Sequence, residues 1–600
     1  MSKHALALAA AVLVGVLATG IAGVALWPVQ PPHPVIRFAT PIPIGVAIPA
    51  AAISHDGKHL AIRSAGLPSQ IYVRKLGEFD TRPIPATSDA APDSLPCFSP
   101  DGDWIAYSTG KTLKKVSVAG GAAQTVADDL DGADLCDWGE DGNIYFGGTP
   151  GIMRVTAAGG RAELVTAEPA SGESGYSGPH LLPGGARLLL TVVRGGLNDL
   201  SLAVLDLTTH EKKILLEGAG FATYAPSGPG SARGYLLYGR DGVLFAAPFD
   251  TRTLTAGPPS PVLEGIARVG PIAFASVSDN GTLVYTAGGD FELGMRLQWA
   301  DRAGTVQALP APVHTYGDLS LSPDGRRAAV SIADLDTLMR DLWLYEIDGD
   351  RLTRLTFGGF NVAPVWMPDG RRMIYWHSDG ANFYDGELRA APADNSAPPV
   401  TLAPLRGSLA TPTSISADAT VLVGSLTHGA DHDLWSLPLG DAAASSGGQA
   451  GATLMPLLGT AFDEHEASLS PDARYLAYTS NESGRDEVYV IPYPGPGAKT
   501  QVSTAGGSMP RWNPSGGELF YASGTQLLAV EVETSPVFRR LTPKVLFEAP
   551  SLANPITGGY DVAPDGSRFL MTANVGTGRQ FELRVVVNWF EELRRLALAK

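Results

Sequence analysis

One short turn signature recurs from end to end of this 600-residue chain and limits the folds open to it. A polar residue followed by glycine, or a close relative of that pair, stands between two apolar runs in twelve places. These places are Asp56-Gly57, Asp101-Gly102, Asp141-Gly142, Gly184-Gly185, Ser227-Gly228, Asn280-Gly281, Asp324-Gly325, Asp369-Gly370, Asp418-Ala419, Asp472-Ala473, Ser515-Gly516 and Asp565-Gly566. Successive copies lie roughly 40 to 54 residues apart, which is the length of one four-stranded propeller blade. The repeat therefore predicts an all-β chain of twelve blade-sized units.

The stretch from Ala467 to Val490 shows how one unit is expected to fold. An apolar run ends at Leu469, the next four residues turn the chain, and a second run begins at Tyr475. A third run covers Glu487 to Ile491, so three antiparallel strands fit into about two dozen residues.

A large apolar side chain stands two residues before the proline, or its equivalent, of most turns. These side chains are Phe98, Trp138, Leu181, Tyr224, Leu321, Trp366, Leu469 and Trp512. We expect them to fill the space between neighbouring blades.

Twelve blades exceed the usual four to eight of one ring, so two tandem six-bladed β-propellers are the economical arrangement. The expected boundaries are 35–301 for the first propeller and 302–588 for the second, although a seven-plus-five split or a shared blade stays open. Val35 to Phe38 is the candidate strand that completes a blade at the other end of the chain. Residues 589–600 are expected to form a short amphipathic helix that caps the second ring.

The N-terminal region predicts export. Residues 1–4 form a short basic start, and the uncharged run 5–27 is long enough to cross a bilayer as a helix. An uncleaved anchor with its N-terminus in the cytoplasm is favoured, and cleavage near Gly23 to Ala25 is the alternative. The proline-rich residues 28–34 then act as a stiff spacer. The expected location is the bacterial cytoplasmic membrane with the propellers in the periplasm or outside the cell, or a secreted form after cleavage.

Charge and cysteine content narrow the range of partners and of compartments. The net charge of −17 and the lack of a basic stripe argue against nucleic acid as a partner. Cys97 and Cys136 occupy corresponding parts of two successive units, offset by one residue. The offset points the side chains to opposite faces of their strands, which favours two unpaired buried cysteines over a disulfide. A disulfide stays open because an exported domain would allow one.

Several phrases resemble known bacterial propellers. Ser99-Pro100-Asp101-Gly102, Ser322-Pro323-Asp324-Gly325 and Ala563-Pro564-Asp565-Gly566 look like the repeats of the periplasmic Tol-system protein TolB. The stretches at 354–370, 480–495, 503–523 and 588–593 are similar to the extracytoplasmic sensor region of bacterial eukaryotic-like serine/threonine kinases. That resemblance implies an exported propeller tethered to a membrane, working as a sensor or scaffold. Phosphotransfer is not implied, because the kinase motifs for ATP and magnesium are missing from this sequence.

No catalytic or cofactor motif stands out, so no catalytic residue, cofactor or metal is predicted. Glu464-His465-Glu466 is too tight for a zinc motif, since adjacent strand residues face opposite sides. The expected function is recognition of a protein, peptide or envelope ligand without catalysis. A sensor working with a separate kinase is the alternative, and a propeller hydrolase or lyase is the second alternative.

Candidate binding residues are sought at the mouth of the central channel, on the innermost strands. Most units carry a small residue three positions before the proline, whereas four units carry a charged residue or histidine there. Those four are Asp137, His180, Arg511 and Asp561, to which we add the upstream residues Tyr316, Asp318, Glu464, His465 and Glu466. A structural ion pair between Arg511 and Asp561 is favoured over a binding role for these two residues.

Overall fold

The structure is a computed structural model of the whole chain, and its regular secondary structure is mostly β-strand. It describes residues 33–598 apart from 41–49, 64–69, 92–93, 129, 131–132, 134, 149–150, 195–198, 229–230, 289–293, 335–336, 381–383, 429–430, 441–452, 496, 554–558 and 576–581. Strands account for 54% of the described residues and helices for 3%, which confirms the all-β prediction.

The unit predicted around Ala467 is a four-stranded antiparallel sheet. Its strands are β41 (Glu464–Leu469), β42 (Tyr475–Ser480), β43 (Glu487–Pro492) and β44 (Thr500–Gln501). They pair in chain order, with Leu469 opposite Leu476 and Tyr478 opposite Tyr489. The three strands expected from the sequence are therefore confirmed, and a short fourth strand completes the sheet.

The recurring turn closes through hydrogen bonds that its own side chains make. Ser470 Oγ donates to Asp472 Oδ1 at 2.6 Å and accepts the backbone N–H of Tyr475 at 3.0 Å. Residue 473 has a positive φ of 52°, the conformation that glycine adopts at the same place in most copies. A serine and an aspartate two residues apart thus hold the hairpin between the first and second strands of a sheet.

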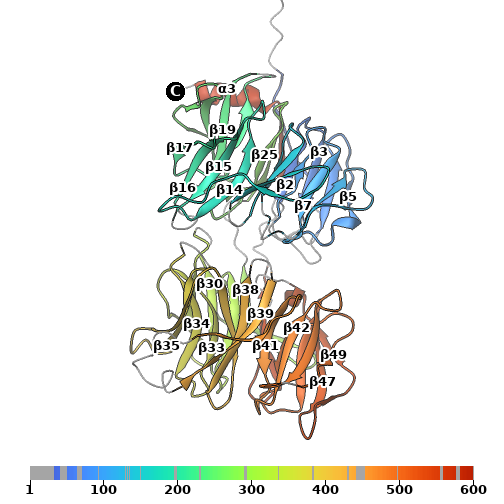
Figure 1. Cartoon of the computed structure of the whole chain (residues 1–600), viewed down its shortest axis with the longest axis vertical. Coiled ribbons are helices and arrows are strands. Elements are labelled where there is room, and N and C mark those ends of the chain that lie inside the picture. The colour runs from blue at the N-terminus through green and yellow to red at the C-terminus, as the bar shows by residue number, and fades with distance from the viewer. Residues whose placement is uncertain are drawn as a thin grey trace, which may run out of the picture.

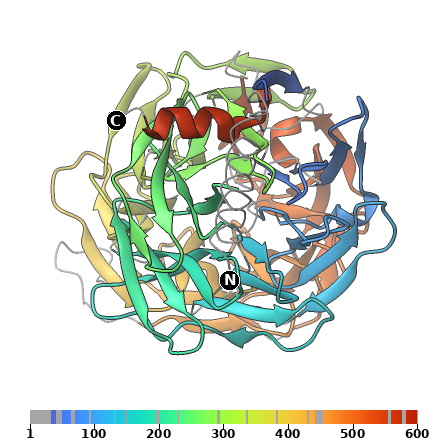
Figure 2. The same cartoon turned by 90° about the horizontal axis from the view of Figure 1, so that it is seen from above.

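The sheets form two bodies that are stacked along the long axis of the molecule (Figure 1). Within the first body the sheets radiate from a central axis, as the view from above shows (Figure 2). This radial arrangement of antiparallel sheets is a β-propeller architecture.

The sheets of the first body are as follows, each in pairing order. They are β2 (Ala50–Ile53), β3 (His59–Arg63), β4 (Ile71–Lys75), β5 (Thr81–Pro83); β6 (Cys97–Phe98), β7 (Trp104–Ser108), β8 (Leu113–Ser117), β9 (Gln124–Ala127); β10 (Cys136–Trp138), β11 (Asn143–Gly147), β12 (Ile152–Thr156), β13 (Glu163–Leu164); β14 (Gly175–Leu181), β15 (Arg187–Val193), β16 (Leu200–Asp206), β17 (Lys212–Glu217); β18 (Thr223–Pro226), β19 (Arg233–Arg240), β20 (Val243–Asp250), β21 (Thr255–Ala256), with β22 (Ser260–Glu264) also on β20; and β25 (Ala275–Val277), β26 (Leu283–Ala287), β52 (Glu582–Val587), β1 (Ile36–Thr40). A small hairpin of β23 (Arg268–Val269) and β24 (Ile272–Ala273) and a 3₁₀ turn at Pro85–Thr87 complete this body.

The second body repeats the pattern. Its four-stranded units are β29 (Tyr316–Leu321), β30 (Arg327–Ala333), β31 (Arg340–Glu346), β32 (Arg351–Arg354); β33 (Phe360–Trp366), β34 (Arg372–Ser378), β35 (Gly386–Pro392), β36 (Val400–Leu405); β37 (Leu409–Ile415), β38 (Val421–His428), β39 (Asp431–Pro438), β40 (Met455–Leu458); β41 to β44; β45 (Ser508–Trp512), β46 (Glu518–Ser523), β47 (Gln526–Glu533), β48 (Arg539–Arg540), with β49 (Lys544–Glu548) also on β47; and β50 (Tyr560–Val562), β51 (Arg568–Asn574), β27 (Met295–Asp301), β28 (Val306–Ala308). A single parallel pair between Arg340 of β31 and Phe360 of β33 joins the first two of these units into one eight-stranded sheet. A 3₁₀ turn covers Pro550–Ala553, and α3 spans Trp589–Leu598.

The chain crosses between the two bodies twice. It leaves the first body after β26 and enters the second as β27, which pairs with β51. It then returns from β51 to the first body as β52, which lies between β26 and β1. The predicted pairing of Val35 to Phe38 with the other end of the chain is confirmed, because Ile36 pairs with Val587 and Phe38 with Val585.

This crossing corrects the expected boundaries. Residues 295–301 were assigned to the first propeller and 582–588 to the second, but their strands belong to the opposite bodies. The predicted cap on the second ring is also wrong, since Trp589 and Leu593 of α3 are buried in the first body beside Leu244 and Ile266. Pattern within one unit cannot reveal an exchange of strands between units that are distant in the sequence.

The two bodies also touch through the loops at their facing ends. Gly270, in the turn between β23 and β24, lies so close to Leu338 of the second body that an added Cβ would sit 3.2 Å from Leu338 Cγ. The ends of the two bodies that carry Gly270 and Leu338 therefore face each other.

The large apolar residues before the turns pack between neighbouring sheets, as predicted. Trp366 is 4% exposed and shares a cluster with Leu342 and Leu344 of the preceding sheet. Its indole N–H also donates to the carbonyl of Ser320 at 3.0 Å, and Trp512 repeats this bond to Ser468 at 2.9 Å. Leu181 differs from the others in being only partly buried.

Cys97 and Cys136 form a disulfide, with their Cα atoms 5.8 Å apart, so the favoured prediction of two unpaired cysteines is wrong. The two residues lie on β6 and β10, the first strands of neighbouring sheets. The face of one radial sheet that points forward meets the face of the next that points backward. Side chains on opposite faces of successive sheets are therefore the ones that can meet.

Among the described residues, no helix is both long enough and apolar enough to span a bilayer. The predicted start 1–4, the anchor 5–27 and most of the spacer 28–34 lie outside the described residues.

The packing of α3 predicts which strands lose stability when the helix is altered. Trp589 is 1% exposed, so Trp589→Ala should lower the free energy of unfolding by about 3–5 kcal/mol. Hydrogen exchange should rise in β1, β25 and β26 of the first body. Arg595→Ala, on the exposed side of the same helix, is the matched control. Increased exchange confined to residues 316–548 would show that the helix packs on the second body instead.

Loss of the disulfide gives a second test. Replacing both cysteines by serine should destabilise the protein by about 2–4 kcal/mol, because the bond closes a loop across two sheets. Thermal melts of wild type with and without reductant, beside the double variant, measure the effect. Identical melts for all three samples would contradict the bond.

Candidate functional site

The nine predicted residues do not gather at one mouth. Asp137, His180, Arg511 and Asp561 lie near the ends of the first strands of their sheets, just before the recurring turn. Tyr316, Asp318, Glu464, His465 and Glu466 lie at the beginnings of such strands. Because the first strands of a propeller run in the same direction along the axis, these two groups lie at opposite ends.

Side chains at the position before the turn connect one sheet to the next. Asp137 Oδ2 accepts the backbone N–H of Leu181 at 2.6 Å, and Asp561 Oδ2 accepts that of Leu321 at 2.7 Å. Serines make the same kind of bond elsewhere, in the pairs Ser276 with Ile53 at 3.2 Å and Ser414 with Leu469 at 3.1 Å. The position therefore has a structural role that the sequence did not reveal.

Asp137 and His180 are brought together, as their neighbouring units suggested. His180 Nδ1 lies 3.5 Å from Asp137 Oδ1, and both side chains are largely shielded from solvent. Burial acts to raise the pKa of Asp137, but the nearby imidazole and the Leu181 N–H outweigh burial and lower it. The pair forms a structural bridge between two sheets of the first body.

Arg511 and Asp561 do not form the expected ion pair. The guanidinium of Arg511 donates to the carbonyl of Pro510 at 3.0 Å, and no carboxylate of the described chain lies within 4.0 Å of it. Both oxygens of Asp561 accept backbone N–H groups, from Leu321 and Val562. Burial raises the pKa of Asp561 despite the positive charge of Arg511 nearby. Arg511 is thus a half-buried cation that makes no ion pair with any described residue.

Two of the predicted residues belong to the protein interior. Tyr316 is fully buried in the core of the second body, and its hydroxyl donates to the carbonyl of Pro312 at 2.5 Å. Glu464 is 1% exposed and accepts hydrogen bonds from the backbone and hydroxyl of Thr460. Neither side chain can reach a ligand, so their assignment to the channel mouth is corrected.

Asp318 and Glu466 hold the beginnings of neighbouring strands in place. Asp318 Oδ2 accepts Ser331 Oγ–H at 2.9 Å and the N–H of Ala363 at 3.2 Å. Glu466 Oε2 makes the equivalent bonds to Thr479 at 2.9 Å and to Met509 at 2.5 Å.

Both backbone donors, Ala363 and Met509, have positive φ values, 53° and 55°. They lie where the strand pairing shifts by a bulge. The two carboxylates therefore stabilise strained backbone in the next sheet.

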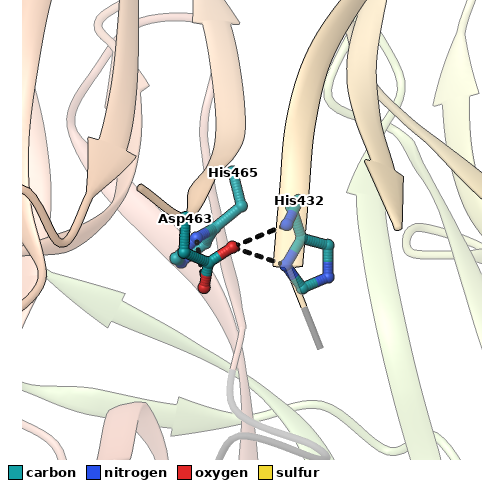
Figure 3. A group of neighbouring side chains, drawn as sticks. All are labelled: His432, Asp463 and His465. Carbon is teal, nitrogen blue, oxygen red and sulfur yellow. Dashed lines mark hydrogen bonds and ion pairs between the residues drawn. The ribbon is translucent and has the colours of Figure 1, made fainter. Parts of the chain in front are cut away.

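His465 lies in a cluster that the sequence analysis missed (Figure 3). Asp463 Oδ1 accepts hydrogen bonds from the backbone N–H of His432 at 2.8 Å and contacts His432 Nδ1 at the same distance. His465 Nδ1 lies 3.7 Å from Asp463 Oδ2, and the two imidazole rings are 5.7 Å apart. Candidate ligand atoms of all three residues lie within 4.8 Å of one another.

The acidic groups around this cluster have pKa values that are shifted by burial and by one another's charges. Burial acts to raise the pKa of Asp463, but the hydrogen bond to His432 and the charges of both histidines lower it. Nearby Asp486 has a raised pKa, mainly through burial and also through the negative charges of Glu466 and Asp463. The beginning of β41 is therefore a site of concentrated negative charge beside two imidazoles.

His432 and Asp463 escaped prediction because the search compared equivalent positions of successive units. His432 lies on β39, the third strand of its sheet, whereas His465 lies on the first strand of the next. The sequence could have indicated this cluster, because the first and third strands of a propeller sheet begin at the same end. His432 and residues 463–465 are therefore expected to lie near each other.

A separate pocket lies between β19 and β25 of the first body. Its lining is mostly apolar, including Leu237, Tyr238 and Val277, with Thr223 and Ser276 as polar members. No charged residue lines it, so it offers shape without a group that would select a polar ligand.

No family model matches this chain, and no curated protein matches it. Among solved structures, it is similar to a putative TolB from Agrobacterium tumefaciens, with 14% identity and a TM-score of 0.37, over 47% of this chain and 99% of that one. It is also similar to the tricorn protease, with 10% identity and a TM-score of 0.29, over 90% and 63%. A GH74 enzyme from Niastella koreensis gives 11% identity and a TM-score of 0.29, over 91% and 90%. The propeller architecture follows from the pairing of the strands themselves.

The two aspartates at equivalent positions predict opposite effects of pH. The lowered pKa of Asp137 adds stability above the unfolded value of about 3.9, which is lost as pH falls through the folded pKa. The raised pKa of Asp561 does the reverse, so its contribution is lost as pH rises.

At pH 7, Asp137→Asn should therefore cost about 1–3 kcal/mol, whereas Asp561→Asn should cost less, because the removal of a buried charge offsets the loss of one of its two backbone hydrogen bonds. Thermal melts of both variants between pH 4 and 8 compare them. Equal losses at neutral pH would contradict the assigned shifts.

Proposed function

We propose that the protein is an exported binding module of two tandem six-bladed β-propellers, which recognises a protein or peptide of the cell envelope without catalysis. In this proposal residues 5–27 anchor it in the cytoplasmic membrane, or are removed on secretion.

Hydrogen bonds between non-successive units support six blades in each ring. Ser276 of the sixth unit binds the N–H of Ile53 in the first, and Asp561 of the twelfth binds that of Leu321 in the seventh. Elsewhere the same bond joins a unit to the next one, as in the pair Asp137 and Leu181. The sixth and twelfth units therefore behave as neighbours of the first and seventh.

The disulfide supports export. Such bonds form and persist in oxidising compartments such as the periplasm and the cell exterior, and are rare in the cytosol. Cys97 and Cys136 are the only cysteines of the chain and pair with each other.

The proposed binding role depends mainly on Arg511. Equivalent positions in the same ring hold Ser320, Val365, Ser414 and Ser468, which are small and uncharged. The remaining equivalent, Asp561, has both oxygens occupied by backbone donors. The guanidinium is thus left to pair with an external anion, and a planar cation of this kind matches a carboxylate well. A peptide carboxylate, from an acidic side chain or a C-terminus, fits this requirement.

Binding is favoured over catalysis because four carboxylates on the first strands already serve the fold. Asp137, Asp318, Glu466 and Asp561 each hold the backbone of a neighbouring sheet. A hydrolase or lyase would need at least one such carboxylate available as acid, base or nucleophile. The sensor alternative uses the same binding surface, with a separate kinase as the partner across the membrane.

Crosslinking and affinity capture of the full chain from its own cells tests the proposal. Wild type, Arg511→Ala and Arg371→Ala should be compared, because Arg371 is an exposed arginine of the same body with no side-chain partner in the described residues. We expect a specific envelope protein to be captured by wild type and Arg371→Ala and reduced at least tenfold with Arg511→Ala.

Identical partners with all three versions would reject the second ring axis as the binding site. A kinase among the partners lost with Arg511→Ala would select the sensor alternative. Capture that depends on Arg511 but comes with turnover of the partner would replace binding by catalysis.

A further inference from the structure

The strongest unassigned feature of the molecule is the cluster of His432, Asp463 and His465. It joins two neighbouring sheets of the second body, since His432 lies near the beginning of β39 and His465 near the beginning of β41. We propose that these three side chains bind one divalent transition-metal ion of the zinc type. This inference is independent of the binding role of Arg511, which lies near the end of β45.

The donor atoms are already close to the separation that a metal requires. Ligands about 2.0–2.2 Å from a tetrahedral zinc ion lie roughly 3.2–3.6 Å from one another. Here His432 Nδ1 and Asp463 Oδ1 are 2.8 Å apart, and His465 Nδ1 and Asp463 Oδ2 are 3.7 Å apart. Small rotations of the side chains would place one ion among all three donors (Figure 3).

An unsatisfied nitrogen points to the same conclusion. His465 Nδ1 is buried and makes no hydrogen bond with any described residue, and its 3.7 Å separation from Asp463 is too long for one. Buried polar atoms are nearly always paired, so a buried imidazole nitrogen without a partner needs a ligand to explain it. A metal ion would satisfy this nitrogen by accepting its lone pair.

The carboxylate between the histidines is held in position by the backbone. The N–H of Asp463 donates to Asn481 Oδ1 at 3.0 Å, and its carbonyl accepts the N–H of Asn481 at 3.3 Å. The backbone N–H of His432 fixes Asp463 Oδ1 from the other side.

An outer carboxylate, Glu466 Oε2, lies 3.9 Å from His465 Nε2. A carboxylate behind a ligating histidine orients the ring and raises its basicity. Both a fixed ligand and an outer carboxylate are thus present around the proposed ion.

The donor set selects the class of metal. Two imidazoles and one carboxylate suit zinc and its first-row neighbours, whereas calcium and magnesium prefer oxygen ligands alone. Three protein ligands leave at least one coordination position for water or an external donor. The ion would tie the third and fourth sheets of the second body together and keep a free position at the end of the axis opposite Arg511.

Isothermal titration of the metal-stripped full chain with zinc chloride tests the site. We expect saturable binding of one ion per chain, a higher melting temperature with zinc, and weaker binding at pH 5 because imidazole must be deprotonated to bind metal. His432→Gln and His465→Gln, which keep similar side-chain volumes, should each weaken binding at least about tenfold. Calcium chloride in place of zinc chloride should give no comparable heat.

His55→Gln is the matched control, because His55 Nδ1 also lies near a carboxylate, 3.3 Å from Asp279, in the first body and outside the cluster. It should bind zinc as wild type does. Near-UV circular dichroism of the metal-free variants separates lost ligands from lost folding, and Asp463→Asn, which keeps the hydrogen-bonding shape, provides a further variant for the same titration. Absence of saturable zinc binding by wild type, or equal affinity in folded His432→Gln and His465→Gln, would overturn the proposal.

Discussion

The pairing of β52 with both β26 and β1 is the interaction on which the rest of the architecture depends. Alone, β25 and β26 would leave the last sheet of the first body with two strands, too few for a stable sheet. The C-terminal strand supplies the third strand and the N-terminal strand the fourth. Val585 of the C-terminal strand is fully buried among neighbouring side chains of the first body. The second body is closed in the same manner, because β27 arrives from the first body and pairs with β51. Each body is therefore completed by a strand that is distant in the sequence from the rest of its sheet.

Local chemistry explains why the sheets themselves were predictable. A serine, an aspartate and a residue with positive φ close several of the hairpins, as at Ser470, Asp472 and residue 473, and these contacts involve neighbours in the sequence. The aromatic residue before the turn, such as Trp366, reports the gap between sheets because only a large side chain fills it. Strand exchange was not predictable, because Leu583 to Val587 reads equally well as an edge strand of either body. The error over Cys97 and Cys136 arose from applying a rule for one sheet to two sheets that face each other.

The candidate sites were predictable only in part, for a related reason. Unit alignment singled out Asp137, His180, Arg511 and Asp561, yet it could not show that aspartates there accept the N–H of the next sheet. That bond uses the same position in four pairs of sheets, made by Ser276, Asp137, Ser414 and Asp561, so an aspartate there is first a structural variant of serine. Arg511 differs because arginine has no acceptor and cannot make this bond. His432 was missed since it meets His465 across two sheets and two different strand positions. Together these residues give the second body a cation at one end of its axis and a cluster of metal-ligand type at the other.

Formation of an engineered disulfide between Ala39 and Arg584, which are partners across β1 and β52, tests the mutual closure of the two bodies most directly. Cysteines at these two exposed positions should oxidise within one chain, beside the native Cys97–Cys136 pair, and peptide mass spectrometry should recover the 39–584 link. A cysteine at 584 paired with one at Gln298 of β27, in the second body, should give no link. Recovery of the 298–584 link in place of the 39–584 link would contradict the closure and return β52 to the second body.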